Sequence, residues 1–199
     1  MGVSAADVEQ LFRESGAFLE GHFVLASGRH AARYLEKFQV LQWPERTALL
    51  CAAIAEHART LNVATVAGPT TGGIILAHEV GKQLGVRAVY AERGDGGTGR
   101  VFRRGFRVTP GERVFVVDDI MTTGGSAQET IDAARAAGAN VVGAAVLVRR
   151  SDGKVDVPLF ALWEVDMATF EPGPATCPQC RAGTPAVHPG TTPAPVGVR

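Results

Sequence analysis

Two adjacent carboxylates stand immediately before a loop that is rich in hydroxyl groups and glycine. Asp118 and Asp119 end the apolar stretch VFVVDD, and the segment TTGGS follows at 122–126. A loop of this kind, leading into a helix, presents backbone N–H groups and hydroxyls that suit a phosphate. The carboxylates would repel that phosphate, so we expect them to accept hydrogen bonds from hydroxyl groups or to help hold Mg²⁺ through water. A ribose phosphate supplies both partners; the simpler alternative is a capped turn with exposed acids.

A second glycine-rich turn lies upstream. The segment GPTTGG at 68–73 follows a short apolar stretch and leads into IILAHEVGKQLG, which has the pattern of a helix. Two such turns at one edge of a sheet give an anionic ligand two loops to bind.

The elements that must position these loops alternate between strand and helix. Such alternation predicts an α/β fold with a central, mostly parallel sheet flanked by helices, and ligands bind such sheets at the carboxyl ends of the strands. An N-terminal helix capped by Ser4 and two strands joined by a turn at 27–28 precede this core. We expect core strands at 63–68, 86–92, 113–119, 140–148 and 159–165, and core helices at 44–59, 74–85 and 126–137.

The composition excludes several classes of protein. The chain has 199 residues, 46% of them hydrophobic, and its 20 basic and 20 acidic side chains cancel. No overall field therefore favours nucleic acid or a membrane, and the longest apolar run, 141–148, is too short to span a bilayer. Three cysteines do not indicate a disulfide framework, so we expect a cytoplasmic protein.

Four segments resemble one known family. VFVVDDIMTTGGSAQET resembles the phosphoribosyl pyrophosphate (PRPP) signature of the type I phosphoribosyltransferases. FVLASGRHAARY, VAGPTTGGIILA and AVLVRRSDG are similar to the substrate-end segment, the pyrophosphate loop and a base-side strand of the orotate phosphoribosyltransferase family. The resemblance implies three parts: an N-terminal helix and base-side hood at 1–43, a core at 44–170, and a Pro-rich extension at 171–199.

The family's reaction follows as an expectation. Orotate N1 would displace pyrophosphate from PRPP to give orotidine 5′-monophosphate in pyrimidine synthesis, with Mg²⁺ bound mainly through PRPP and Asp118 and Asp119 as candidate ligands through water. The resemblance also implies a homodimer with PRPP and orotate as its small-molecule partners. A phosphoribosyltransferase of the same fold acting on a purine or another base, and a non-enzymatic PRPP-sensing regulator, are the alternatives.

Site residues carry over position by position. The catalytic candidates are Asp118, Asp119, Arg100 and Arg104. The resemblance assigns the base to Thr122, Arg150, Tyr34 and Lys37, with Arg149 as the competitor of Arg150. It assigns PRPP to Arg93, Thr70, Thr71, Gly72, Asp118, Asp119, Ile120, Met121, Thr122, Thr123, Gly124, Gly125 and Ser126.

A glycine- and arginine-rich segment at about 92–107 is interpreted as a flexible lid that reaches the neighbouring subunit's site. A solvated hairpin is the alternative. The family's lid lysines are absent here, and so are two further lysines, whose places are taken by Ala26 and Gly72. Arg100 or Arg104 is expected to supply the lid's cation, and Lys37 is a candidate to replace one of the lost lysines.

The last segment changes in character. From 171 to 199 the chain holds seven of its eleven prolines, which predicts an irregular extension. CPQC at 177–180 favours a small turn with free thiols or a reversible disulfide over zinc, because one CxxC with His188 leaves a four-ligand site incomplete. The other histidines have no ligand partners at suitable spacing and are expected to be structural: His22, His30, His57 and His78.

Overall fold

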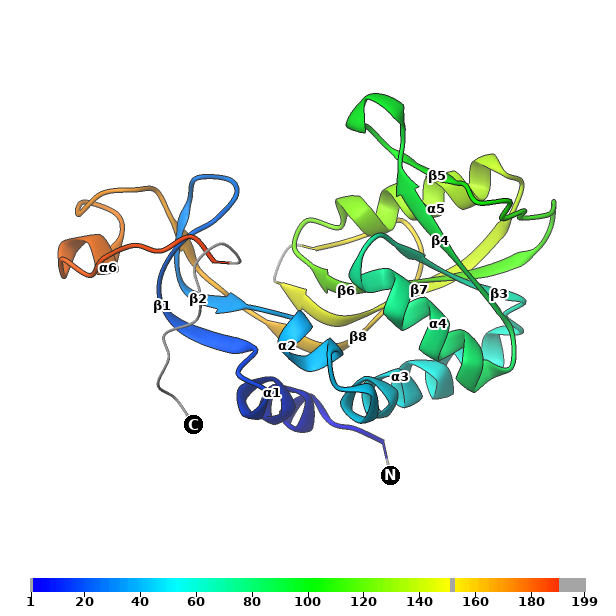
Figure 1. Ribbon diagram of the computed structural model, residues 1–199, viewed down its shortest axis with the longest axis horizontal. Coiled ribbons are helices and arrows are strands. Elements are labelled where there is room, and N and C mark those ends of the chain that lie inside the picture. Colours follow the sequence, from blue (N-terminus) through cyan, green and yellow to red (C-terminus); the bar gives the residue numbers. More distant parts are fainter. Residues whose placement is uncertain (1, 151–152, 190–199) are drawn as a thin grey trace.

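A computed structural model describes residues 2–150 and 153–189. This part of the chain forms a six-stranded sheet in the order β5-β4-β3-β6-β7-β8 and a separate three-stranded sheet (Figure 1). Neighbouring strands of the larger sheet are parallel, except that β5 runs antiparallel to β4. The strands are β3 (Thr65–Pro69), β4 (Arg87–Arg93), β5 (Arg100–Phe102), β6 (Arg113–Met121), β7 (Asn140–Arg150) and β8 (Leu159–Val165).

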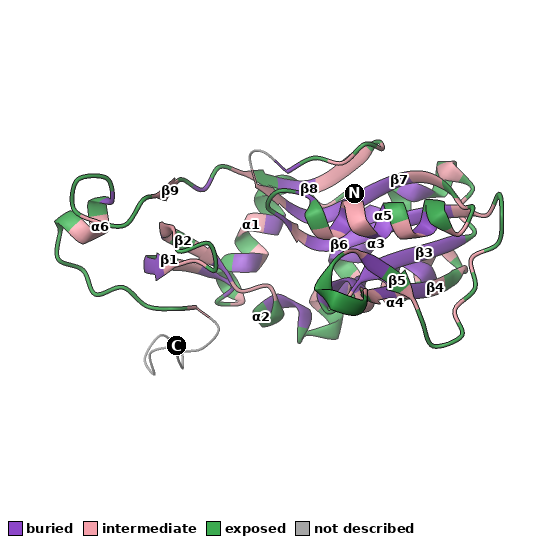
Figure 2. Cartoon of the chain, turned by 90° about the horizontal axis from the view of Figure 1, so that it is seen from above, coloured by how far each residue is buried: buried purple, intermediate pink, exposed green. Residues whose placement is uncertain are grey.

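Helices cover both faces of this sheet (Figure 1). On one face lie α1 (Ala5–Glu14), α3 (Pro44–Ala58) and α4 (Gly72–Leu84), and on the other lies α5 (Gly125–Ala136). The predicted mostly parallel α/β fold is confirmed. Figure 2 shows the consequence for burial, because the strands between these layers are largely buried while the outer faces of the helices are exposed.

Strand β6 divides the core in two. Its side chains alternate between the faces of the sheet, as the pleat requires. Phe115 and Val117 join the cluster that α1, α3 and α4 form, while Val114 and Val116 pack with Ile131 of α5. The continuous apolar run in the sequence is thus a strand buried on both faces.

The N-terminal segment builds the smaller sheet. Strands β1 (Phe18–Val24) and β2 (His30–Leu35) form an antiparallel hairpin, with Gly28 at a φ of 78° in its turn. Short helix α2 (Phe38–Leu41) follows and leads into the core. Two short 3-10 helices, η1 (Arg59–Leu61) and η2 (Asp95–Gly97), lie in the connections of the larger sheet.

Three expectations need correction. β8 is not the last strand, because β9 (Thr169–Phe170) pairs with β2. Helix α4 begins at Gly72, two residues before the predicted start. The extension is not wholly irregular, since it contains α6 (Pro178–Arg181) and since Val187 exchanges backbone hydrogen bonds with the β1 strand. Its residues 190–199 lie outside the described part.

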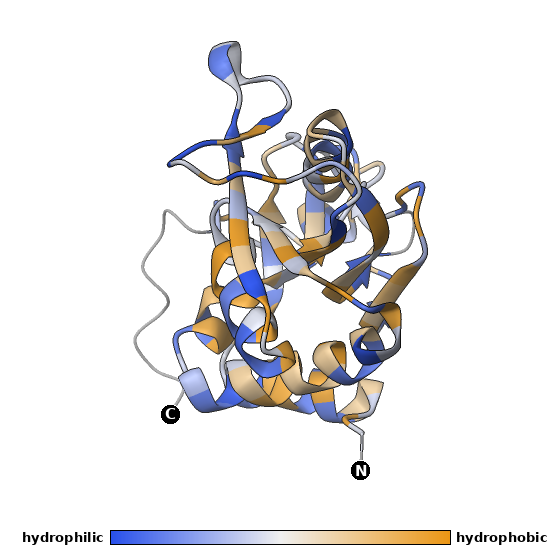
Figure 3. Ribbon diagram, turned by 90° about the vertical axis from the view of Figure 1, so that its right-hand side faces the viewer, coloured by the Kyte–Doolittle hydropathy of each residue, from blue (hydrophilic) through white to orange (hydrophobic). Residues whose placement is uncertain are grey.

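Segment 92–107, for which a flexible lid and a solvated hairpin were the two interpretations, contains a hairpin. Residues 91–93 of β4 pair with 100–102 of β5, and the tip between them projects from the body of the molecule and is largely hydrophilic (Figure 3). No helix in 2–150 or 153–189 combines the length and the apolar character that crossing a bilayer requires.

Candidate active site

The two acids at the carboxyl end of β6 are both buried. Asp118 is 5% exposed and Asp119 is 4% exposed. Because successive strand residues point to opposite faces, each acid meets the start of a different helix. The Ser126 hydroxyl of α5 donates to Asp118 Oδ2 at 2.5 Å. On the other face, a Cβ atom added to Gly72 of α4 would lie 1.8 Å from Asp119 Oδ2.

Backbone and lysine donors surround the carboxylates. The Asp119 N–H donates to Asp118 Oδ1 at 2.8 Å, and the Ile120 N–H donates to Asp119 Oδ1 at 2.6 Å. Lys37 Nζ lies 3.3 Å from Asp119 Oδ1. Burial raises the pKa of Asp118 to about 6, and the charge of Asp119 adds to that shift while the Ser126 hydrogen bond opposes it.

The loop between β6 and α5 leaves a helix start available to a ligand. Gly124, the N-cap of α5, has a φ of 97°, and a Cβ there would lie 2.2 Å from the Lys154 carbonyl oxygen. A glycine is therefore required, and α5 consequently has no side-chain cap. Its first N–H groups are free to bind an anion beside the exposed Thr122 and Thr123.

The turn at 68–73 likewise needs glycine for close packing and leads into a helix that has no side-chain cap. Gly68 and Gly73 approach closely, since a Cβ on Gly68 would lie 2.1 Å from the Gly73 carbonyl oxygen. The Thr70–Thr71 peptide bond is cis, and the Thr70 N–H donates to the Ala91 carbonyl at 3.0 Å. Thr71 does not cap α4 with its side chain, so this helix too presents free N–H groups at its start.

Arg100 lies in β5, where it pairs with Arg93, and not at the tip of the hairpin. It is 8% exposed, and its Nη1 donates to Thr70 Oγ1 and to the Ala91 carbonyl, both at 3.1 Å. Its buried Nε, 3.6 Å from Glu129 Oε2, has no hydrogen-bond partner within the described residues. Burial lowers the pKa of Arg100, and the charge of Asp118 opposes that shift. This cation is fixed at the edge of the second turn.

The other arginines of the hairpin are exposed and pair locally. Arg104 Nη2 lies 2.9 Å from Glu92 Oε1, and Arg103 Nη2 lies 2.7 Å from Asp95 Oδ1. Arg93 donates to the Gly97 carbonyl at 3.2 Å. Of the two arginines expected to supply a cation, only Arg100 contacts a residue of the candidate site in this conformation.

A pocket of about 280 Å³ opens next to the acid pair. All four residues expected to bind the base line it, namely Tyr34, Lys37, Thr122 and Arg150. The remaining lining residues are Arg33, Leu35, Glu36, Ile120 and Met167. A larger hollow of about 500 Å³ lies between the 106–110 segment and α5, but its mostly apolar lining includes neither aspartate.

Alternation along β7 separates the two competing arginines. Arg150 lines the pocket and donates through Nη2 to the Met167 carbonyl at 3.1 Å, and burial lowers its pKa against the opposing charge of Asp166. Arg149 instead donates to the Gly153 carbonyl at 2.7 Å and lies 3.1 Å from Glu164 Oε1. Only Arg150 is in position to meet a ligand there.

Two of the histidines for which sequence spacing offered no ligand partners have such partners in space. His22 and His30 lie side by side and meet both cysteines of the CPQC segment. His57 stacks on Phe160 with ring centroids 4.1 Å apart. Sequence spacing could not reveal the cluster, because its two halves are about 150 residues apart along the chain.

Sequence reasoning also missed Arg33 and Met167 in the pocket and Glu129 beside Arg100. Neither pocket residue carried a sequence signal, because strand alternation places Arg33 on the face opposite its neighbour Tyr34 and Met167 lies in a loop.

Comparisons agree with this geometry. Residues 38–166 match the model of the phosphoribosyl transferase domain family. An orotate phosphoribosyltransferase of Heliobacterium modesticaldum is 47% identical over 194 residues, covering 95% of this chain and 99% of the relative. One from Caldicellulosiruptor bescii is 43% identical over 184 residues, covering 92% and 95%. The crystal structure of orotate phosphoribosyltransferase from Aeropyrum pernix superposes with a TM-score of 0.69 at 28% identity, covering 79% of this chain and 93% of that one.

A parallel sheet with two uncapped helix starts around a buried acid pair defines the class, which is that of the phosphoribosyltransferases. Within that class the chain belongs to the orotate phosphoribosyltransferase family.

The contact between Gly72 and Asp119 predicts the effect of one methyl group. Gly72→Ala should lower the free energy of unfolding by about 1–3 kcal/mol, because the added Cβ collides with a buried carboxylate. Gly125→Ala is the matched control at the start of α5, where the nearest atom would be Thr123 Oγ1 at 3.8 Å. Urea denaturation measures both, and equal stabilities of the two variants would contradict the packing described here.

The buried Asp118 predicts a pH dependence of stability. Its pKa is raised in the folded state, so the protonated form is favoured, and its contribution to stability is lost as the pH rises from about 4 to about 6. Wild type should therefore lose about 2–3 kcal/mol relative to Asp118→Asn over that interval. Parallel denaturation curves measure the difference, and a constant difference would exclude a raised pKa.

Proposed function

We propose that this chain transfers the phosphoribosyl group of PRPP to N1 of orotate, releasing pyrophosphate and forming orotidine 5′-monophosphate. The observation that carries the proposal is the pocket that brings Tyr34, Lys37 and Arg150 next to the acid pair of β6. A base bound there lies beside a ribose bound at the acids, which is the arrangement that joining the two requires.

PRPP would bind across both loops. Asp118 and Asp119 accept hydrogen bonds from the ribose hydroxyls, because an ionised carboxylate is purely an acceptor. The N–H groups at the start of α5 and the hydroxyls of 122–126 hold the 5′-phosphate, and the turn at 70–72 holds the pyrophosphate. Two uncapped helix starts support this division, since each can receive one anionic group.

The donors present fit a Mg²⁺ ion that the substrate carries. Among the described residues, no third carboxylate, histidine or cysteine completes a cluster with Asp118 and Asp119. Mg²⁺ commonly takes one or two carboxylates and completes its shell with phosphate oxygens and water. When bound, the ion would neutralise charge on the leaving pyrophosphate.

The chain's own residues would contribute position and charge. Orotate would react as its N1 anion, with the N1 proton lost to solvent before the bond to the ribose forms. The bond from the ribose to pyrophosphate breaks as the bond to N1 forms, with positive charge developing on the ribose. Buried Asp118 and Asp119 stabilise that charge, and Arg100 beside Thr70 stabilises the negative charge growing on pyrophosphate.

Arg150 would select the base. Its planar fork suits bidentate binding of the orotate carboxylate. One Nη2 donor reaches the Met167 carbonyl, which fixes the fork and leaves other N–H groups for a ligand. An uncharged purine would leave this half-buried cation without an anionic partner.

The proposal includes a cytoplasmic homodimer. All three cysteines are free thiols, which suits a reducing compartment. The projecting β4–β5 hairpin carries exposed arginines that could reach a polyanion in a neighbouring subunit's site.

The assay that tests the function mixes purified protein with PRPP, Mg²⁺ and orotate. We expect the ultraviolet absorbance of orotate to fall with equimolar release of pyrophosphate, and no turnover of adenine, hypoxanthine or uracil. Turnover of a purine would favour the same fold with another base. PRPP binding with no turnover of any base would favour a PRPP-sensing regulator.

Removing one arginine tests the base pocket. Arg150→Ala should raise the KM for orotate by roughly 10- to 100-fold, the effect of losing hydrogen bonds to a charged group, with a smaller change in the KM for PRPP. Arg149→Ala is the matched control, because that neighbour lies outside the pocket and should change neither KM by more than about twofold. An unchanged KM for orotate in Arg150→Ala would refute the assignment.

A further inference from the structure

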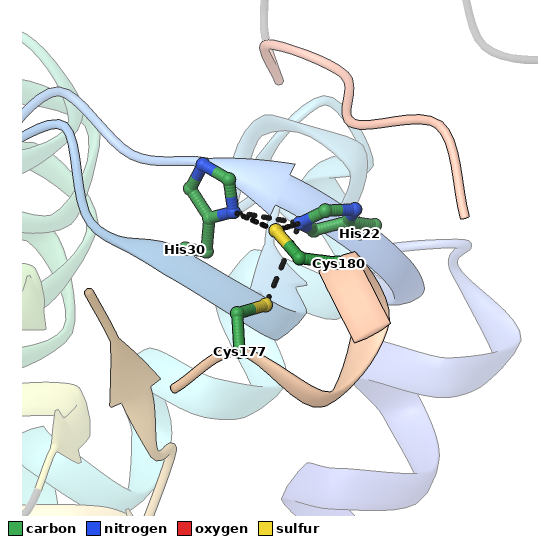
Figure 4. Close-up of side chains that lie close together, drawn as sticks. All are labelled: His22, His30, Cys177 and Cys180. Atoms are coloured by element: carbon green, nitrogen blue, oxygen red, sulfur yellow. Dashed lines mark hydrogen bonds between the residues drawn. The ribbon is translucent and has the colours of Figure 1, made fainter. Parts of the chain in front are cut away.

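Four side chains with metal-binding atoms converge at the outer end of the molecule. His22 extends from β1 and His30 from β2, while Cys177 is the N-cap of α6 and Cys180 lies within its single turn (Figure 4). Figure 4 shows the four side chains turned toward a common centre. One atom from each, an imidazole nitrogen or a sulfur, lies within 4.8 Å of all the others.

The distances from both sulfurs to His22 match those of a tetrahedral zinc site, and the other two measured distances are shorter. Bond lengths of about 2.3 Å to sulfur and 2.0–2.1 Å to nitrogen place sulfur and nitrogen ligands of one zinc ion about 3.6 Å apart. Both cysteine sulfurs lie 3.6 Å from His22 Nε2, and Cys180 Sγ lies 3.2 Å from His30 Nδ1. The two imidazole nitrogens, 2.7 Å apart, would separate to about 3.4 Å around a metal.

Hydrogen bonding fixes the tautomer of His22. Its Nδ1 lies 2.7 Å from the Thr184 carbonyl oxygen, which can only accept, so Nδ1 carries the proton and Nε2 presents a lone pair. Three other groups, His30 Nδ1 and the two sulfurs, surround that lone pair. One lone pair cannot accept hydrogen bonds from all three, whereas a cation satisfies all four groups. A histidine that donates its other nitrogen to a backbone carbonyl is also the usual arrangement around zinc.

Burial supports a structural role. Cys177 is 0% exposed and His22 is 3% exposed, and the other two ligands are half-buried. We propose that His22, His30, Cys177 and Cys180 bind one structural Zn²⁺ ion. Two sulfur and two imidazole ligands in a tetrahedron favour zinc, and four protein ligands leave no open position for catalysis.

The ion would fasten the Pro-rich extension to the N-terminal hairpin. Within 171–189 only Cys177 is buried, and Val187 and Thr184 join this segment to β1 through two backbone hydrogen bonds and the contact with His22 Nδ1. Joining segments about 150 residues apart restricts the unfolded chain, so the metal should stabilise the folded state.

Metal analysis of untagged protein tests the proposal. We expect one zinc ion per chain after purification. The double variant with Cys180→Ser and His30→Asn should lose nearly all of it. These two positions are chosen because they are half-buried, so substitution there disturbs the fold least. Cys51→Ala and His57→Asn are matched controls outside the cluster and should keep the metal. Cobalt exchanged into the site should give the intense visible bands of tetrahedral coordination and a thiolate charge-transfer band.

A second measurement does not depend on variants. Chelation should lower the melting temperature and expose the peptide bond after Arg181 to trypsin, because the α6 turn is then released. Added Zn²⁺ should restore both. The proposal would be overturned if the purified protein contained no zinc or contained iron instead. A Cys177–Cys180 disulfide after anaerobic purification would also overturn it. So would equal zinc loss in the control variants or an octahedral cobalt spectrum.

Discussion

The structure depends on burying two adjacent carboxylates at the end of one strand. Neither Asp118 nor Asp119 could remain ionised in an apolar interior without donors, because desolvation of a bare carboxylate is very costly. Strand alternation gives the two acids different partners on opposite faces, the Ser126 hydroxyl for Asp118 and Lys37 for Asp119. Asp119 also requires a glycine at position 72, because any side chain there would collide with its carboxylate. The acids therefore determine how both neighbouring helices begin, and both beginnings face the ligand.

A departure from the family pattern accompanies this packing. The resemblance places a lysine where this chain has Gly72, yet Asp119 Oδ2 lies where the Cβ of any side chain at that position would be. A positive charge reaches Asp119 from elsewhere, through Lys37 just before α2. Arg100 supplies a second cation at the same turn, beside Thr70, and its buried Nε and lowered pKa indicate a group that gains from the arrival of an anion.

Local patterns sufficed to predict the core and most of the site. The continuous apolar run ending at Asp119, with glycine-rich turns behind two strands, defines a parallel α/β sheet and its ligand edge. Contacts between distant segments were beyond such patterns. Arg100 is buried only because the hairpin folds back over Thr70, and β9 is a strand only because β2 offers its edge. The His22–Cys180 contact likewise joins segments whose separate spacings indicate nothing.

The two ends of β2 lie next to different groups, the histidine–cysteine cluster at its start and the Lys37–Asp119 ion pair just beyond its end. His30 begins β2 within the histidine–cysteine cluster, and Tyr34 lies four residues later in the pocket, about 13 Å along an extended strand. Lys37 follows and pairs with Asp119. With the proposed ion bound, β2 would be held at its start by the metal and just beyond its end by the Lys37 ion pair, so the position of Tyr34 relative to the acid pair would be set from both sides. The extension would then act on the base pocket without touching it, through the strand that connects them.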